Sequence, residues 1–148
     1  MMDFKEIDSQ NDIDELLEAY GGFHDACLVS TVFQSGAYVD DNLSMGFGEA
    51  DDYVLTATFQ RQWRPKTLEM RFIGLRRFHL TGAEDNYIPL LFEAFVSFQE
   101  NLLPGEPKRL IVWSDEEFHA NKIDNSLTEP AGSYIVANEL EWRIIEDQ

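Results

Sequence analysis

The stretch YVLTATFQRQWRPKTLEMRF, residues 53–72, decides the fold. Apolar side chains alternate with polar ones over residues 53–62, and the alternation returns at Leu68, Met70 and Phe72. A period of two is typical of a strand with one buried face. Between the two runs lies Trp-Arg-Pro-Lys at 63–66, a short turn-like break. The stretch therefore predicts an antiparallel hairpin.

Strand patterns continue on both sides of this hairpin. Residues 26–33 are rich in β-branched side chains, 109–113 form a short apolar run, and 134–144 alternate to the end. Gly74 interrupts the alternation before Phe78 and Leu80, which predicts a bulge. The pattern over 89–99 suits a helix or a strand, and we favour a strand.

One helix is predicted, over residues 9–20. Ser9 is a good N-cap, and Asp12 stands three residues later, where a capping box has Glu or Gln. Gly21 and Gly22 provide the stop signal. Four apolar residues form the stripe that would face the sheet: Ile13, Leu16, Leu17 and Tyr20.

The connections between successive strands are short, which favours an antiparallel sheet over parallel units with helical crossovers. We expect a mainly β (α+β) chain: a curved antiparallel meander sheet or a partly closed barrel of about six strands, with one N-terminal helix. Residues 40–52 are read as a long exposed connection, and 1–148 as a single domain.

The chain has 148 residues, with 28 acidic and 11 basic side chains and a net charge of −17. Such a field is the opposite of what a nucleic-acid binder needs, and it disfavours an anionic membrane surface. We see no signal peptide and no apolar membrane span, and expect a cytoplasmic protein. The single cysteine, Cys27, fits a reducing compartment.

The acidity has two readings, a device for solubility or an attraction for a basic protein partner. The stretch 26–60 has no Lys or Arg, whereas 61–80 has six basic residues and one acidic residue. Loops carry binding more often than strand cores do. The candidate partner-binding residues are therefore the carboxylates of the long connection: Asp40, Asp41, Glu49, Asp51 and Asp52.

Phe23-His24-Asp25 is the most distinctive local motif. A His beside an Asp is part of a metal-dependent phosphohydrolase signature, although that chemistry needs further ligands on helices. Alternatively, His24 or Asp25 bonds backbone groups at the turn. Cys27 follows His24 by three residues, but strand spacing would place the two side chains on opposite faces, so Cys27 reads as a small buried hydrophobe.

Asp115 and His119 stand four residues apart and would share a face if a helical turn formed. Two ligands do not make a site, and one Cys with three scattered His residues does not supply a zinc centre. We expect no cofactor, no metal site and no catalytic constellation.

Three segments carry a resemblance to known families: Gly-Gly-Phe-His-Asp-Ala at 21–26, Leu-Ile-Val-Trp-Ser-Asp at 110–115, and Tyr-Ile-Val-Ala-Asn-Glu-Leu-Glu-Trp-Arg-Ile at 134–144. With the capped helix before them, they resemble a family of small uncharacterised bacterial proteins. Phe-His-Asp near the start of an acidic chain of this size is also similar to immunity proteins of polymorphic toxin systems. That resemblance implies binding and blocking of a cognate toxin, and it assigns no functional residue.

Three functions follow as hypotheses. The first is a non-enzymatic acidic binding protein, an immunity-type inhibitor of a basic toxin that meets it with the acidic connection. The second is a small hydrolase or metal-dependent enzyme that uses His24, Asp25 and His119. The third is a homo-oligomeric structural domain that pairs through an exposed strand edge.

Overall fold

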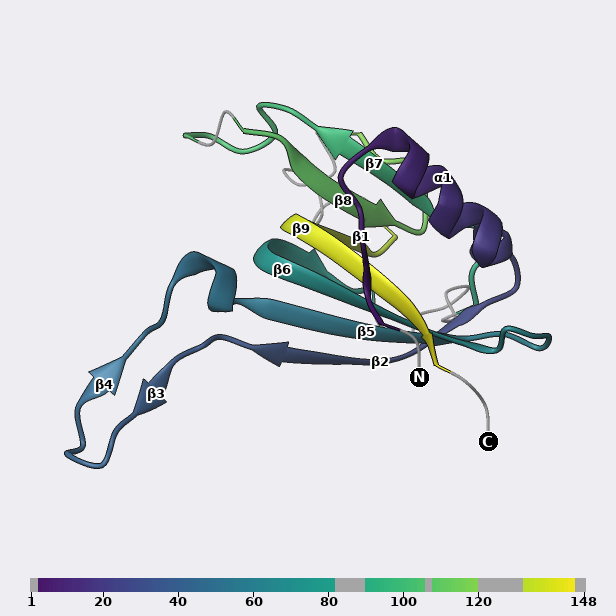
Figure 1. Cartoon of the computed structure of the whole chain (residues 1–148). Coiled ribbons are helices and arrows are strands. Elements are labelled where there is room, and N and C mark those ends of the chain that lie inside the picture. The colour runs from purple at the N-terminus through teal and green to yellow at the C-terminus, as the bar shows by residue number, and fades with distance from the viewer. Residues whose placement is uncertain (1–2, 82–89, 106–107, 120–131, 146–148) are drawn as a thin grey trace.

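Figure 1 shows the computed structural model of the chain, which describes residues 3–81, 90–105, 108–119 and 132–145. A seven-stranded antiparallel sheet carries one α-helix on one of its faces. The strand order is β2-β5-β6-β9-β8-β7, and β1 pairs with β9 beside this path. The strands are β1 (Lys5–Glu6), β2 (Cys27–Gln34), β5 (Val54–Gln60), β6 (Thr67–His79), β7 (Phe95–Gln99), β8 (Leu110–Ser114) and β9 (Tyr134–Ile145).

The predicted fold class is confirmed: the described chain is mainly β, with one N-terminal helix on an antiparallel sheet. The sheet is open rather than closed into a barrel, with β2 and β7 as its two ends. Its order departs from a simple meander, because β9 lies between β6 and β8. The first half of β9 pairs with β8 and its second half pairs with β1, while β6 runs along its other side.

The hairpin over residues 53–72 is confirmed as β5 and β6. Leu55 lies opposite Phe72 and Phe59 lies opposite Leu68, so that the buried side chains of the two strands share one face. Arg61 closes the turn: its backbone N–H donates to Lys66 O at 3.0 Å, and its Nε donates to Pro65 O at 2.8 Å. This arginine is buried and structural, which its position in a basic stretch did not indicate.

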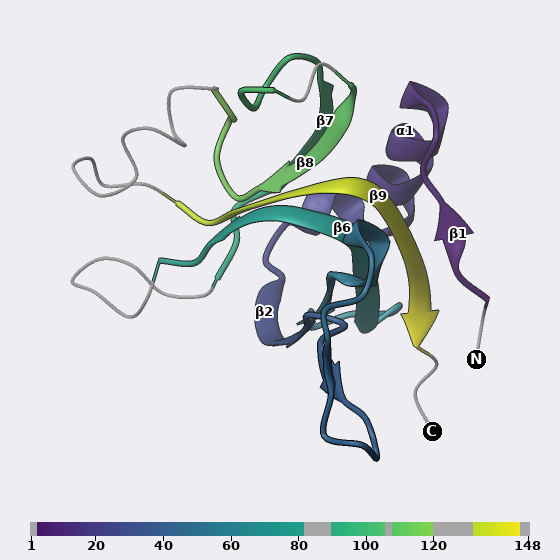
Figure 2. The ribbon, with the colours of Figure 1, turned by 90° about the vertical axis from the view of Figure 1, so that its left-hand side faces the viewer.

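Helix α1 (Gln10–Ala19) ends where its caps predict. Ser9 Oγ accepts the backbone N–H of Asp12, and the Asp12 carboxylate accepts the backbone N–H of Ser9, so the shorter Asp completes the capping box. A short 3-10 helix, η1 (Gly21–Phe23), follows at once. Figure 2 shows the helix lying against the sheet.

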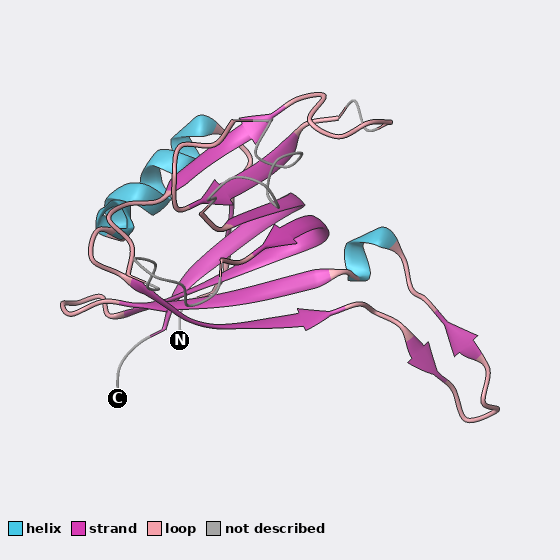
Figure 3. Ribbon diagram, turned by 180° about the vertical axis from the view of Figure 1, so that it is seen from behind, coloured by secondary structure: helices cyan, strands magenta, loops and turns pink. Residues whose placement is uncertain are grey.

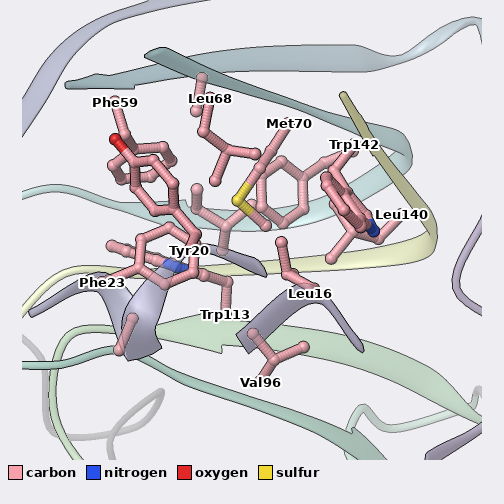
Figure 4. Close-up of a cluster of buried hydrophobic side chains, with 14 of the residues drawn as sticks. Leu16, Tyr20, Phe23, Phe59, Leu68, Met70, Val96, Trp113, Leu140 and Trp142 are labelled. Atoms are coloured by element: carbon pink, nitrogen blue, oxygen red, sulfur yellow. The ribbon is translucent and has the colours of Figure 1, made fainter. Parts of the chain in front are cut away.

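The core lies between α1 and the sheet (Figure 4). Phe23 makes edge contacts with Tyr20, Phe59 and Trp113 at ring-centroid distances of 5.3, 5.1 and 6.2 Å. The hydroxyl of Tyr20 donates to Lys66 O at 2.9 Å, and burial raises the pKa of this phenol above its ordinary range. These four aromatic residues therefore fill a packed interior.

A second, smaller cluster explains why every residue of β8 is buried. Ile111 and Trp113 face the main core, whereas Leu110 and Val112 face the other side. There they pack with Leu103, Phe118, Tyr134 and Val136. A strand that is covered on both faces shows a continuous apolar run rather than alternation.

The predicted bulge is confirmed in β6, where the register shifts between Leu75 and Arg77. Gly74 has φ 69°, and a Cβ there would lie 2.9 Å from Asn138 Cβ on β9. Only a residue without a side chain allows this close approach of the two strands.

Two readings of connecting segments need correction. Residues 40–52, predicted as a long exposed connection, are exposed but not irregular throughout: they contain β4 (Met45–Gly46), which pairs with β3 (Tyr38–Val39) in a second small sheet, and a 3-10 helix, η2 (Ala50–Asp52). Only the end of 89–99 is a strand, β7, and Leu90 makes an isolated bridge with Cys27. Pro89 lies outside the described residues.

Candidate functional site

The hairpin of β3 and β4 projects from the end of the sheet that carries the last residues of β2 and the first of β5 (Figure 3). We call residues 35–48 the arm. Its strands pair over only two positions, Tyr38 with Gly46 and Val39 with Met45. A hairpin of this size has no core of its own. Its apolar side chains are therefore not explained by packing within the arm.

Exposed apolar residues concentrate on the arm and the strand beside it. Fourteen large hydrophobic side chains are exposed among the described residues, and nine of them lie between positions 29 and 53. They are Val29, Val32, Phe33, Tyr38, Val39, Leu43, Met45, Phe47 and Tyr53. Large apolar areas on a protein surface are typical of interaction sites. The sequence held a signal for it, since Met45 and Phe47 interrupt an otherwise polar stretch.

The tip of the arm combines exposure with an unusual backbone. Leu43 is 85% exposed and has φ 64°, in the left-handed region that favours Gly, Asn and Asp. Neither property stabilises the hairpin by itself. A bulky side chain kept in a strained position at a surface is typical of a functional contact.

Asp40 builds the turn that presents this tip. Its Oδ1 accepts the backbone N–H groups of Asn42 and Ser44, each at 2.9 Å. Its own N–H donates to Ser44 O at 2.9 Å. Asp40, a candidate partner-binding residue, therefore also has a structural role, because its carboxylate holds the turn.

Asp52 holds the root of the arm. Its Oδ2 accepts the backbone N–H of Glu49 at 2.8 Å, and the two side chains cap η2 reciprocally. Gly36 and Gly48, both with positive φ, approach Asp52 so closely that a Cβ would lie 2.5 Å from its Cβ or 2.8 Å from its Oδ2. Asp41 and Asp51 complete the five acidic candidates, all of which are exposed.

The structure also brings two arginines to the arm, which the sequence order concealed. A shallow groove at the root is lined on one side by Phe47, Glu49 and Tyr53, and on the other by Leu75, Arg76 and Arg77 of β6. The guanidinium of Arg76 donates to Gly74 O at 2.7 Å. The negative charge of the arm is therefore partly neutralised by these arginines at its root, but not toward its tip.

Strand β2 forms the free edge beside the arm. It pairs with β5 on one side, and along its other side the described residues contribute one bridge, from Leu90 to Cys27. The strand has no charged residue and no proline from Cys27 to Gln34. Exposed edges are ordinarily protected by such residues, and within the described part of the chain no strand pairs with this edge beyond Cys27.

His24 and Asp25 lie together at the start of β2. His24 Nδ1 is 2.8 Å from Phe92 O, and its Nε2 is 3.3 Å from Asp25 Oδ2. The His24 and Asp25 side chains are 62% and 47% exposed. The histidine thus ties the turn after α1 to the segment before β7. Asp25 has φ 57°, so its place in the turn rests on its backbone conformation.

The remaining chemical candidates lie apart. Cys27, expected to be buried, is half-buried at the sheet edge. Asp115 Oδ1 accepts the backbone N–H of Ser133 at 2.8 Å, and residues 115–119 form no helix, so the face shared with His119 does not exist. Within the described residues, no group of three His, Cys, Asp or Glu side chains is placed to hold a metal ion.

No helix among the described residues is long and apolar enough to cross a membrane. The chain matches no protein-family model, no curated protein and no solved structure.

Proposed function

We propose that this chain is a non-enzymatic acidic binding protein that blocks a basic protein, in the manner of the immunity-type inhibitors that its sequence resembles. The arm and the free edge of β2 form the proposed docking surface. The observation that carries the proposal is the concentration of exposed hydrophobic side chains on an acidic stretch without Lys or Arg. Apolar contacts supply affinity, and the surrounding carboxylates select a basic surface and speed its approach.

The proposed partner therefore combines positive charge with apolar groups. A basic surface alone would meet carboxylates that already bond backbone N–H groups at Asp40 and Asp52. An apolar surface alone would leave the charge of Asp41 unmatched. Because β2 is an uncharged edge, a partner that presents a strand could also extend the sheet.

The test first asks whether a basic protein is encoded beside this gene in the source genome, whose absence would count against the proposal, and then measures association with that protein. The variant Asp41→Asn/Asp51→Asn, called the arm variant, removes one charge from the arm and one from η2 at its root, and it keeps an acceptor oxygen at each position. The matched control, Asp14→Asn/Glu18→Gln, removes two charges from α1. We expect the arm variant to associate several-fold more slowly, with a flatter salt dependence, and to dissociate at nearly the wild-type rate.

The control separates the local effect from the loss of net charge, because both variants change the total by the same amount. Equal association rates for the arm variant and the control would contradict a docking role for the arm. A neighbouring basic protein that associates at a rate independent of salt would contradict it as well.

A further inference from the structure

Both ends of β2 carry exposed apolar side chains, and they differ in the charged residues beside them. The arm leaves one end, with its exposed apolar side chains and carboxylates. At the other end lies the β5–β6 turn, where Trp63 is 43% exposed and Arg64 and Lys66 are exposed. Leu90 and Phe92, 45% and 82% exposed, lie beside the same end, because Leu90 bridges to Cys27.

A second copy of this chain presents that basic and apolar end to the arm if the two β2 strands pair antiparallel. Antiparallel pairing about a twofold axis reverses one copy, so the arm end of each copy meets the turn end of the other. In Figures 1 and 2 the arm extends beyond the free edge of β2, on the side where the partner would lie.

The lengths agree with this arrangement. The bridge between Leu90 and Cys27 covers the start of the edge, so the part that the described residues leave unpaired is centred near Val32. At about 3.3 Å per residue, Tyr38 to Asp41 lie at most roughly 20–30 Å from Val32, because Gly36 has φ 77° and the arm turns away from the line of β2. Gln60 lies opposite Cys27, so the partner's β5–β6 turn begins at roughly 17 Å and ends within about 30 Å. The arm therefore reaches the partner's turn.

The net charge of −17 does not prevent this contact. At physiological ionic strength the Debye length is about 8 Å, so that distant carboxylates of the two copies are largely screened. Asp25 and Glu93 also lie at the turn end, and the local attraction rests on Arg64 and Lys66. Trp63, Leu90 and Phe92 supply the apolar surface against the side chains of the arm.

We propose that two copies of the chain form such a dimer through β2, each arm covering the basic and apolar end of its partner. The contact is the same in both directions, so it closes with two copies and leaves no free arm. This inference rests on the proposed binding role of the arm, and it identifies what covers the arm in the absence of the basic partner. The foreign partner then competes with self-association.

The test exchanges charges between the two contact regions and follows mass by sedimentation equilibrium of the full chain. The tip variant is Asp40→Asn/Asp41→Lys, and the turn variant is Arg64→Glu/Lys66→Glu. We expect the wild type to dimerise at concentrations of about 1–100 μM. Each variant alone should dimerise at least about tenfold more weakly, because like charges then face each other.

An equimolar mixture of the two variants restores opposite charges at both contacts, and we expect it to regain a dimer. That recovery also shows that both variants fold. Val32→Lys, which places like charges opposite each other near the twofold axis, should leave the chain monomeric.

A wild type that is monomeric throughout this range overturns the dimer. So does a mixture that gains no mass over the separate variants. Neither result bears on binding of a basic partner, which is measured with that partner and the arm variant of the preceding test. Conversely, a dimer whose arm variant binds the basic partner at the wild-type rate would overturn only the proposed function.

Discussion

The aspartates of this chain have different roles, although each carries the same charge. Asp12, Asp40 and Asp52 accept backbone N–H groups and fix a helix start, a turn and the root of the arm. Asp41 lies exposed at the tip of the arm. The number of carboxylates in the sequence predicts a field, but only the geometry separates the structural ones from those that can meet a partner.

The capping box gives a first prediction. Ser9→Ala should lower the free energy of unfolding by about 1 kcal/mol, because an N–H at the start of α1 loses its acceptor.

The Asp12 carboxylate of the same capping box has a pKa below its ordinary value, and the main cause is the hydrogen bond that it accepts from the Asp8 N–H. A lowered pKa in the folded state means that this carboxylate stabilises the fold above its ordinary pKa of 3.8 and loses the effect as pH falls.

Urea unfolding at a series of pH values from about 6 to 3 measures this effect. Wild-type stability should fall more steeply with acidification than that of Asp12→Asn, which has no carboxylate to protonate. An identical pH dependence of the two proteins would contradict the role given to Asp12.

Asp25 gives a second prediction. The structure changes the reason for which this residue stabilises the turn. The sequence suggested that its side chain closes the turn by a backbone hydrogen bond, whereas the structure shows positive φ and a contact with His24. We expect Asp25→Ala to cost about 1 kcal/mol through left-handed strain, and Asp25→Asn to cost much less. Chemical denaturation of both variants checks this, and equal losses would favour a role for the charge.

Among the secondary-structure elements, the helix and the central hairpin were predictable and the arm was not. Caps and a period of two are local signals, and they defined α1, β5 and β6. The arm was hidden because its strands have two residues each, too few to establish a period. Its apolar side chains do not form a core face, so they followed neither strand nor helix spacing.

The root of the arm gives a third prediction. Gly48 has φ 69°, and a Cβ there would lie 2.8 Å from Asp52 Oδ2 and 3.0 Å from Gly36 O. Gly48→Ala should therefore speed hydrogen exchange of the arm amides while leaving exchange in β5 and β6 unchanged. Gly105→Ala is the matched control, since Gly105 has φ 78° with no atom within 4 Å. Faster exchange throughout the sheet would show that the arm is part of the folding core.

At the scale of the whole molecule, the sequence predicted the buried core of the sheet better than the ion pairs on the face that does not carry the main core. Glu69 pairs with Arg143, and Arg71 with Glu141, each at 3.0 Å across β6 and β9. These contacts depend on β9 entering the sheet beside β6, and alternation within a strand does not reveal its neighbour. The basic stretch 61–80 is consequently divided between structural arginines and the exposed turn at Arg64 and Lys66.

The candidate site was not predicted for a similar reason, because its parts lie far apart in the sequence. Arg76 and Arg77 of β6 lie beside the root of the arm, and the β5–β6 turn lies beside the other end of β2. Both placements arise only when β5 and β6 fold back next to β2. The acidic segment itself could be proposed from charge alone. Its apolar component became visible only from the exposure of each side chain, because nine of the fourteen exposed large hydrophobic residues in the described part of the chain lie between positions 29 and 53.

One comparison tests the binding role of the arm most directly: the stability of Leu43→Asn against its affinity for the basic protein encoded beside the gene. Asn adopts φ 64° with less strain than Leu, and Leu43 is 85% exposed. We therefore expect the free energy of unfolding to stay equal or rise. Affinity should fall at least about tenfold. The control Leu80→Asn, at an exposed position outside the arm, should bind as the wild type does. Unchanged affinity of Leu43→Asn would contradict the account.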